Sequence, residues 1–252
     1  MNFKLTIQYD GTEFHGWQMQ GDEQRTVQGE LTRVLNLLDG RDDVLVHGAG
    51  RTDAGVHALA QVANVELRRE ITPDKLRAAI NGNLGWDVRV VHAEAVSGDF
   101  HARYSAKGKT YCYRVFNAPF MSPFWRRYAH HEARALDIER MRRAACLFLG
   151  EHDWTAFSAA QSEVKTRVRT LTELEVKVRR SERGAGPVVD ITVSANGFLR
   201  YMVRSIAGTL MAVGRGEMDE ERIRRAMTSG ERNLAGATAP ACGLTLVHVH
   251  YD

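Results

Sequence analysis

Apolar and polar residues alternate along several stretches of this chain, and this period of two restricts its fold more than any other feature. The alternation covers residues 3–9, 174–178 and 189–193. A segment with one apolar and one polar face is typical of a strand in an antiparallel sheet that is solvated on one side. Further extended runs are expected at residues 44–47, 56–67, 88–96, 111–115 and 244–251. The pattern therefore predicts a protein rich in half-buried strands.

Segments with helical spacing separate these strands. Apolar residues recur three and four apart over residues 27–38, with Thr26 as the expected N-cap, and Pro73 opens a second helix. Further helices are expected over residues 137–149 and 198–213 and after Asp219. Strand pairs outnumber strand–helix–strand crossovers, which predicts an α+β fold with a mainly antiparallel sheet rather than a doubly wound fold. Two halves of similar content suggest two domains, residues 1–104 and 105–252.

The composition is that of an ordinary soluble globular protein, with 44% hydrophobic and 26% charged residues. No apolar run approaches the ~20 residues of a membrane span. The three cysteines are scattered and odd in number, which favours reduced thiols in a cytoplasm. Only six of the 34 cationic residues are lysines, which leaves 28 arginines. Arginine suits phosphates and bases, although a GC-rich genome would produce the same bias.

Residues 48–58, GAGRTDAGVHA, place an arginine and an aspartate among three glycines. A P-loop needs Lys and Ser or Thr after its last glycine, and a dinucleotide fingerprint needs a different glycine spacing, so a nucleotide-phosphate site is disfavoured. In a catalytic loop, Asp53 would be rigidly placed and Arg51 could reach it, which would favour a carboxylate that acts as a nucleophile. The alternative is an aspartate that caps a turn beside an exposed arginine.

Two further pairs of residues suggest a site. Arg200 and Arg204 are four apart in an otherwise apolar helical stretch, so they are expected on one helix face, where Asp53 is a candidate partner. Tyr111 and Tyr113 lie on an expected strand and could stack on a planar base, or they are ordinary sheet aromatics.

Several motifs resemble the TruA family of tRNA pseudouridine synthases. They are YDGTEFHGWQMQ at residues 9–20, TVQGEL at 26–31, GRTDAGVHA at 50–58, DFHARYSAKGKTYCYRV at 99–115, FLGEHDWTAFSA at 148–159, FLRYMVRSIAGTL at 198–210 and APACGLTL at 239–246. They occur in the family's order and span nearly the whole chain. Arg200-Tyr201 and Cys242 depart from the family pattern, which leaves the role of Arg200 open.

The resemblance implies isomerisation of uridine to pseudouridine at tRNA positions 38, 39 and 40 in the anticodon stem–loop. Asp53 would be the catalytic nucleophile, and its target (the sugar, C6 of the base or a sugar proton) stays open. Arg204 would pair with Asp53, and Tyr111 would stack on the uracil and help to move a proton. Arg51 would replace the flipped base or hold its phosphate, and Lys107 and Lys109 would touch phosphates.

The same resemblance implies a pseudouridine synthase fold, in which two α/β halves join their sheets into one mixed, mostly antiparallel sheet with the active cleft between them. It also implies a homodimer that binds tRNA in the cytoplasm, with no cofactor, no metal and no membrane partner. Two rival functions remain at this point. One is an RNA-binding protein without catalysis, against which the retention of Asp53 argues, and the other is the disfavoured nucleotide-phosphate enzyme.

Overall fold

The computed structural model describes residues 1–20, 24–160, 164–180 and 186–251, which group into two compact units. Unit 1 comprises Met1–Lys107 with Thr245–Asp252, and unit 2 comprises Gly108–Leu244. The expected domain division after residue 104 stays a prediction. The compact units differ from it mainly in the last eight residues, which join the N-terminal part of the chain.

The strands of unit 1 form a mixed sheet in the order β4-β1-β3-β10, with β2 also on β3. The strands are β1 (Asn2–Tyr9), β2 (Val46–Gly48), β3 (His57–Glu66), β4 (Val88–Val96) and β10 (Leu244–His250). β1 pairs antiparallel with β3 and β4, β2 pairs antiparallel with β3, and β10 pairs with β3 in parallel. The alternation in residues 3–9 is confirmed as β1, whose apolar side chains at 3, 5, 7 and 9 are buried.

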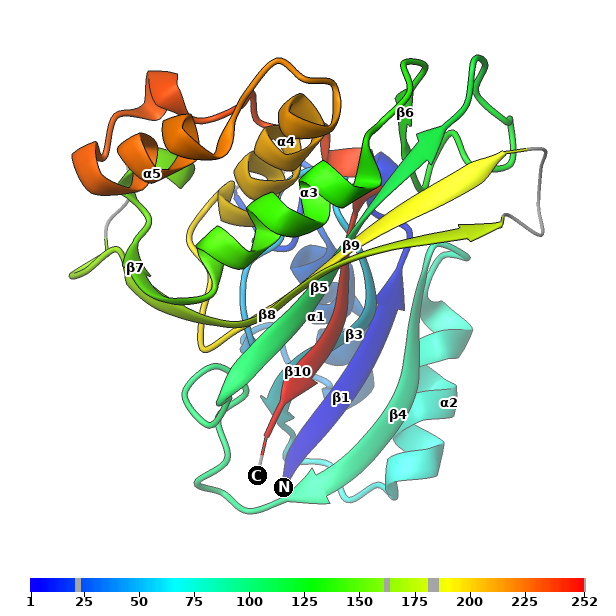
Figure 1. Ribbon diagram of the computed structural model, residues 1–252. Helices are drawn as coiled ribbons and strands as arrows, with labels where there is room; N and C mark the ends of the chain where they lie inside the picture. Colours follow the sequence, from blue (N-terminus) through cyan, green and yellow to red (C-terminus); the bar gives the residue numbers. More distant parts are fainter. Residues whose placement is uncertain (21–23, 161–163, 181–185, 252) are drawn as a thin grey trace. The chain divides into compact units, whose positions relative to one another are not determined.

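The helices of unit 1, α1 (Val27–Asp39) and α2 (Pro73–Asn83), lie on the same face of this sheet (Figure 1). The Thr26 hydroxyl accepts a hydrogen bond from the Gly29 N–H, which confirms the expected cap. The buried stripe of α1 is the apolar set that the sequence spacing predicted, except for Leu38, which is half-buried: Val27, Leu31, Val34 and Leu35. A short 3₁₀ helix, η1 (Gly11–Glu13), follows β1.

Unit 2 contains a second mixed sheet, in the order β5-β9-β8-β7, with β6 paired to the last three residues of β5. Its strands are β5 (Gly108–Asn117), β6 (His130–Glu132), β7 (Gly150–Asp153), β8 (Val168–Arg180) and β9 (Pro187–Ala195). β5 and β6 pair in parallel, and β5–β9, β9–β8 and β8–β7 pair antiparallel. Both units are therefore mixed but mostly antiparallel, which confirms the predicted α+β class.

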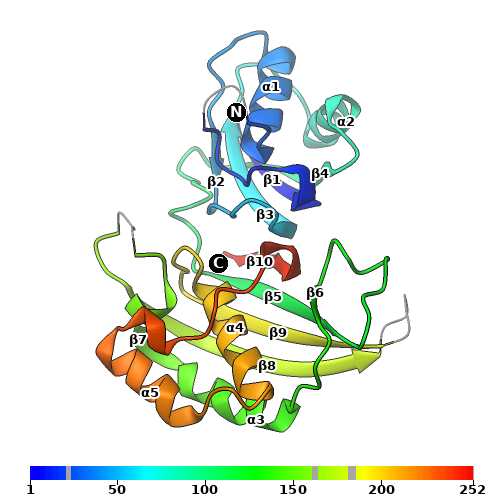
Figure 2. The ribbon, with the colours of Figure 1, turned by 90° about the horizontal axis from the view of Figure 1, so that it is seen from above.

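Three helices, α3 (Ile138–Ala145), α4 (Met202–Gly214) and α5 (Glu220–Ser229), gather on one side of this second sheet (Figure 2). Asp137 and Asp219 cap α3 and α5 through their carboxylates. The chain past Ala145 tightens into the 3₁₀ helix η2 (Cys146–Phe148), so the α-helix is shorter than the predicted 137–149. α4 is buried along nearly its whole length and forms the centre of the unit's core.

Candidate active site

The loop that carries Asp53 emerges at one end of the unit 1 sheet. Tyr9, the last residue of β1, is opposite Ala58 of β3 and Val88 of β4. The segment that precedes β3, which contains Asp53, and the segment that follows β1 therefore leave the sheet at the same end. This end of the sheet brings the GRTDAGVHA and YDGTEFHGWQMQ motifs together.

Backbone hydrogen bonds fix these two segments to each other. The Trp17 N–H donates to the Thr52 carbonyl at 3.1 Å, and the Gly55 N–H donates to the Phe14 carbonyl at 3.3 Å. The Val56 N–H donates to the Asp53 carbonyl at 3.1 Å and closes a turn around the aspartate. We call this arrangement, residues 14–17 bonded to residues 52–56, the clasp. It holds the Asp53 backbone from both sides.

A hydrogen bond between two side chains anchors the clasp to the core. The Tyr9 hydroxyl lies 2.8 Å from the Thr52 hydroxyl oxygen, and both side chains are buried. Burial raises the pKa of Tyr9 to about 12, against the smaller opposing effect of the hydrogen bond to Thr52. Sequence reasoning missed Tyr9 and Thr52 as supports of the site, because nothing in their spacing reveals this contact.

Gly16 lets the two segments approach each other. Its φ of +92° lies in the left-handed region, and a Cβ at this position would stand 2.6 Å from the Thr52 carbonyl oxygen. That oxygen belongs to backbone, so it cannot move aside as a flexible side chain would. The clasp therefore requires a glycine at position 16.

Arg51 contacts Gln18 rather than Asp53, and its expected role at the flipped base stays a prediction. Its Nε donates to the Gln18 side-chain oxygen at 3.1 Å, and within the described residues it forms no ion pair with Asp53. The reason is the turn at Thr52, whose buried side chain faces Tyr9 while Arg51 is exposed. Arg51 thus stands at the surface beside the clasp.

Tyr111 lies on β5 in unit 2, where it is opposite Val193 of β9. Its ring is 7% exposed and packs edge-on against Phe198, with the ring centroids 4.9 Å apart. Tyr113 lies on the same strand but is completely buried, and its hydroxyl donates to the Pro240 carbonyl at 3.0 Å. Tyr113 is therefore a core residue, which favours the alternative of an ordinary sheet aromatic at this position.

Arg204 lies in the first turn of α4 and is fixed by the segment that precedes β10. Its Nε donates to the Ala239 carbonyl at 2.7 Å, and the Ala239 N–H donates back to the Arg204 carbonyl at 3.0 Å. The guanidinium carbon lies 5.0 Å from the centroid of the Tyr201 ring. The Ala239 carbonyl and the Tyr201 ring together restrict the orientation of the Arg204 guanidinium.

Arg200 and Arg204 do not share a helix face, which corrects the expectation of a helix from residue 198. Tyr201, the residue after Arg200, has a φ of 67°, and α4 begins only at Met202. A left-handed residue cannot continue a right-handed helix, so Arg200 lies outside it. The exposed Arg200 instead donates to the Tyr201 hydroxyl at 3.0 Å and covers that ring from 4.8 Å.

An open pocket of about 400 Å³ adjoins this helix entry within unit 2. It is lined by two arginines, three hydroxyl side chains and Tyr201: Ser158, Ala159, Ala160, Arg200, Tyr201, Ser205, Arg232 and Thr238. Arg232 donates to the Gly236 carbonyl and to the Thr238 hydroxyl at 2.8 and 2.9 Å. Guanidinium groups beside hydroxyls suit an anionic ligand such as a phosphate.

The two lysines of the predicted site bracket the start of β5. Lys107 is exposed, and its backbone N–H donates to the His250 carbonyl at 2.9 Å. Lys109 is half-buried and lies opposite Ala195 of β9. Lys109 and Tyr111 are two apart on one strand, so they project from the same face of the sheet.

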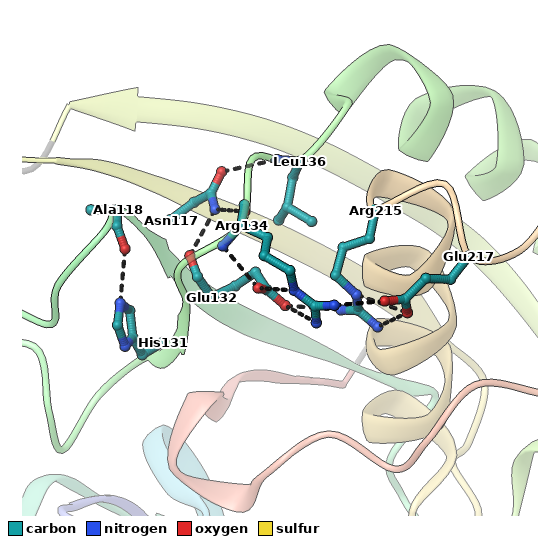
Figure 3. A network of polar contacts seen from close by, with 8 residues as sticks. All are labelled: Asn117, Ala118, His131, Glu132, Arg134, Leu136, Arg215 and Glu217. Carbon is teal, nitrogen blue, oxygen red and sulfur yellow. Dashed lines mark hydrogen bonds and ion pairs between the residues drawn. The ribbon is translucent and has the colours of Figure 1, made fainter.

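A charged hub, centred on Glu132, ties β6 to the end of α4 (Figure 3). The buried Glu132 carboxylate accepts from Arg134 Nε and from Arg215 Nη1, both at 3.0 Å, and both arginines also bond Glu217. Burial alone would raise the pKa of Glu132, but the hydrogen bonds from Arg134 and the charges of Arg134 and Arg215 hold it below its usual value. The hub stabilises unit 2 and holds no predicted site residue.

A family model described as tRNA pseudouridine synthase matches residues 5–105 and 144–252. The matched ranges contain Arg51, Asp53 and Arg204, whereas Lys107, Lys109 and Tyr111 fall between them. In the described part of the chain, no helix has the length and apolar character needed to cross a membrane.

Curated relatives align along nearly the whole chain, including the stretch between the matched ranges. The tRNA pseudouridine synthase A of Acetivibrio thermocellus is 44% identical over 250 residues, which cover 99% of each chain. The tRNA pseudouridine synthase A 2 proteins of Bacillus cereus and Clostridium perfringens are 42% and 41% identical over the same length and coverage. A chain in the solved structure titled "Crystal Structure of a Cbf5-Nop10-Gar1 Complex" aligns with 97% of this chain and 49% of its own length, at 14% identity and a TM-score of 0.40, which is too distant to add to these findings.

Proposed function

Because the chain belongs to the tRNA pseudouridine synthase family, we propose that it isomerises uridines at positions 38, 39 and 40 in the anticodon stem–loop of tRNA. The protein is an isomerase of tRNA uridine, and the choice of these three positions is the proposed part. The reaction breaks the N1–C1′ bond, forms a C5–C1′ bond, removes the proton from C5 and leaves one on N1. Reactant and product contain the same atoms.

Asp53 is the proposed catalytic residue, and the clasp is the observation that carries this assignment. An isomerase must hold its carboxylate still while the base turns, and the clasp fixes the Asp53 backbone by hydrogen bonds on both sides. The carboxylate acts in its ionised form, whether it attacks C1′, attacks C6 or removes a sugar proton.

Arg204 and Tyr111 are the proposed partners of Asp53. We assign the terminal nitrogens of Arg204 to the Asp53 carboxylate, since its Nε is already fixed by the Ala239 carbonyl. A planar guanidinium suits a carboxylate and favours its charged form. Tyr111, held edge-on by Phe198, is assigned to stack on the flipped uracil, with its hydroxyl taking part in the transfer of the C5 proton.

Three cations are proposed to bind the RNA. Arg51 is exposed beside the clasp and takes the place of the extruded base in the stem, which offsets part of the few kcal/mol that base flipping costs. Lys107 and Lys109, at the start of β5, contact phosphates. We further propose a cytoplasmic homodimer whose two subunits bind the tRNA together.

Release of tritium tests the function directly. Unmodified tRNA labelled with tritium at uridine C5 should lose its label to water when the protein is added, because the C5–C1′ bond replaces the bond from C5 to hydrogen. Asp53→Ala should abolish release and leave tRNA binding and thermal stability close to those of the parent. Asp74→Ala, which removes an exposed carboxylate of α2 in the same unit, serves as the matched control and should release tritium at the parent rate. Release by Asp53→Ala at the parent rate would refute the catalytic assignment.

The role of Arg51 needs a separate measurement. Arg51→Ala should slow the single-turnover reaction on bound tRNA, since the flipped state is no longer stabilised. If this variant only weakened tRNA binding and left the bound reaction at its parent rate, Arg51 would be a phosphate contact instead.

A further inference from the structure

Trp86 is the most exposed large hydrophobic residue among the described residues. Its side chain is 96% accessible, whereas the other three tryptophans of the chain, Trp17, Trp125 and Trp154, are 1%, 9% and 0% accessible. It lies in a tight turn between α2 and β4, which the Val88 N–H closes onto the Gly85 carbonyl. Full exposure of an indole to water is unfavourable, so we expect this side chain to bind a partner.

Arg89 holds a cation against one face of this indole. Its guanidinium carbon lies 5.1 Å from the ring centroid of Trp86. Nη1 of Arg89 donates to the carbonyls of Leu84, Gly85 and Val88, so the guanidinium is fixed to the turn itself. Within the described residues, Arg89 pairs with no carboxylate, and Trp86 has no other ring contact. The result is a supported aromatic surface with a guanidinium attached to it.

The turn that presents Trp86 is rigidly attached to the rest of unit 1. Asp87 accepts two hydrogen bonds from Arg25, at 2.6 and 2.9 Å, and the guanidinium of Arg25 in turn covers the Phe14 ring from 4.2 Å. The Asp87 carbonyl also accepts from the Asp10 N–H at 2.9 Å. An exposed side chain on a fixed turn loses little entropy when it binds.

Trp86 and Asp53 belong to the same end of the unit 1 sheet. Tyr9 of β1 is opposite both Ala58, which follows the Asp53 loop, and Val88, which follows Trp86. Two strand spacings separate these two positions, which is about 10 Å. Phe14, under Arg25, also belongs to the clasp. An RNA stem–loop that reaches Asp53 therefore has nucleotides within reach of Trp86.

We propose that Trp86, supported by Arg89, is a stacking site for an unpaired nucleobase of the bound tRNA, a few nucleotides from the uridine that reacts. The inference rests on the proposed function for the presence of RNA at this end of unit 1. A large π-face with an attached cation suits a base and its phosphate, and stacking of this kind tolerates any base. Stacking on Trp86 thus adds to tRNA affinity at a site away from the reacting atoms.

Quenching of tryptophan fluorescence by acrylamide tests the proposal, because three of the four tryptophans are buried. The free parent protein should be quenched far more steeply than Trp86→Phe. Saturation with unmodified tRNA should reduce the quenching of the parent to the level of that variant. Unchanged quenching at saturation, with binding confirmed by filter retention, would overturn the proposal. A fall in quenching with protein concentration alone would also overturn it, because the occupant would then be a second copy of the chain.

Binding measurements provide the second test. Trp86→Ala should weaken tRNA binding about 5- to 100-fold, which is the range found for loss of one stacked base, and Trp86→Phe should recover most of that affinity. The slope of log affinity against log salt should stay unchanged, since no phosphate contact is lost. Leu37→Ala, a truncation of another exposed apolar side chain on α1, should bind like the parent.

Different results would refute the proposed tRNA target and the proposed stacking site. If the parent protein binds unmodified tRNA and releases tritium while Trp86→Ala binds as tightly as the parent, only the stacking site is wrong. If the parent protein releases no tritium from any labelled tRNA position between 38 and 40, the proposed target is wrong whatever Trp86 does. A Trp86→Ala variant that lowers the salt slope as well as the affinity would reassign the turn to phosphate binding.

Discussion

The two units hold their proposed site residues by different means. In unit 1, the clasp around Asp53 consists of backbone hydrogen bonds, a close approach at Gly16 and a bond between two buried hydroxyls. In unit 2, the entry to α4 beside Arg204 depends on a strained Tyr201, and the far end of α4 is tied to β6 by the charged hub of Glu132. Around Asp53, unit 1 uses uncharged groups and glycine geometry. Unit 2 fixes Arg204 by hydrogen bonds to the Ala239 backbone, and a left-handed residue and a charged hub lie at the two ends of α4.

This difference predicts which changes destabilise each unit. Uncharged backbone contacts depend on shape, so the clasp should respond to added side-chain volume and little to acid or salt. A buried carboxylate between arginines depends on its charge, so the hub should respond to acid. Substitutions at four positions separate these dependences, beginning with the largest expected effect.

Gly16→Ala should destabilise unit 1 by about 3 kcal/mol or more, because the new Cβ meets the Thr52 carbonyl oxygen and the backbone is left-handed. Denaturant unfolding measures the loss, and the tritium assay should lose most of its rate as the Asp53 loop shifts. Gly40→Ala is the matched control, because its φ is +68° but nothing lies within 4 Å of its Cβ. This control should cost only about 1 kcal/mol. Equal costs for the two variants would mean that close packing is not what holds the clasp.

Glu132→Gln should destabilise unit 2 by about 2 kcal/mol at neutral pH, because it leaves the cations of Arg134 and Arg215 without their shared anion. The pKa of Glu132 is lowered in the folded protein, so its stabilisation is complete above the unfolded value and is lost as the pH falls through the folded one. The gap in unfolding free energy between parent and variant should therefore close in acid. Glu217→Gln, at a half-exposed carboxylate of the same hub, should cost less. A gap that stays constant down to strong acid would show that charge is not the source.

Tyr9→Phe should change the response of unit 1 to base. The pKa of Tyr9 rises to about 12 on folding, so the neutral phenol stabilises the fold fully below its unfolded pKa and loses this contribution as the pH rises from about 10 to 12. The parent should lose about 2 kcal/mol over this interval that the variant does not lose. Unfolding free energies at several alkaline pH values give the comparison, with Tyr104→Phe, at an exposed ring, as the control. Parallel curves for parent and Tyr9→Phe would contradict the prediction.

The smallest expected effect is the difference in stability between Tyr201→Gly and Tyr201→Ala, which tests for backbone strain at the start of α4. Both remove the ring that Arg200 and Arg204 cover, so their difference reports the backbone alone. Glycine accepts a φ of 67° without penalty, so Tyr201→Gly should be more stable than Tyr201→Ala by about 1 kcal/mol. Equal stability in thermal unfolding would mean that the entry to α4 is not strained.

Local patterns predicted most of the secondary structure. The alternation at residues 3–9 became β1, and Thr26 capped α1, because both signals depend only on neighbouring residues. The start of α4 was predicted four residues too early, since the apolar spacing continues back to Phe198 while Tyr201 takes a left-handed conformation. Tyr113 looked equivalent to Tyr111, and both are buried, but their contacts differ: the Tyr113 hydroxyl bonds the Pro240 carbonyl, and the Tyr111 ring packs against Phe198.

The members of the candidate site come from sequence motifs and stay a prediction, whereas the contacts that support them appear only in the structure. Asp53, Arg204 and Tyr111 were chosen from motifs that resemble a family, to which the chain belongs. The contacts of Tyr9 with Thr52 and of Arg51 with Gln18 join residues more than 30 positions apart, and no local pattern encodes such distances.

By itself, the sequence determined the α+β class, the capped helices, the family and the identity of the proposed catalytic residues, because each is written in side-chain type and spacing. Only the tertiary structure decided that the last strand, β10, joins β3 in parallel, that Gly16 sits against the Thr52 carbonyl and that Trp86 faces solvent on a fixed turn. These features depend on how distant segments pack, and packing is a property of the whole fold rather than of any stretch of chain.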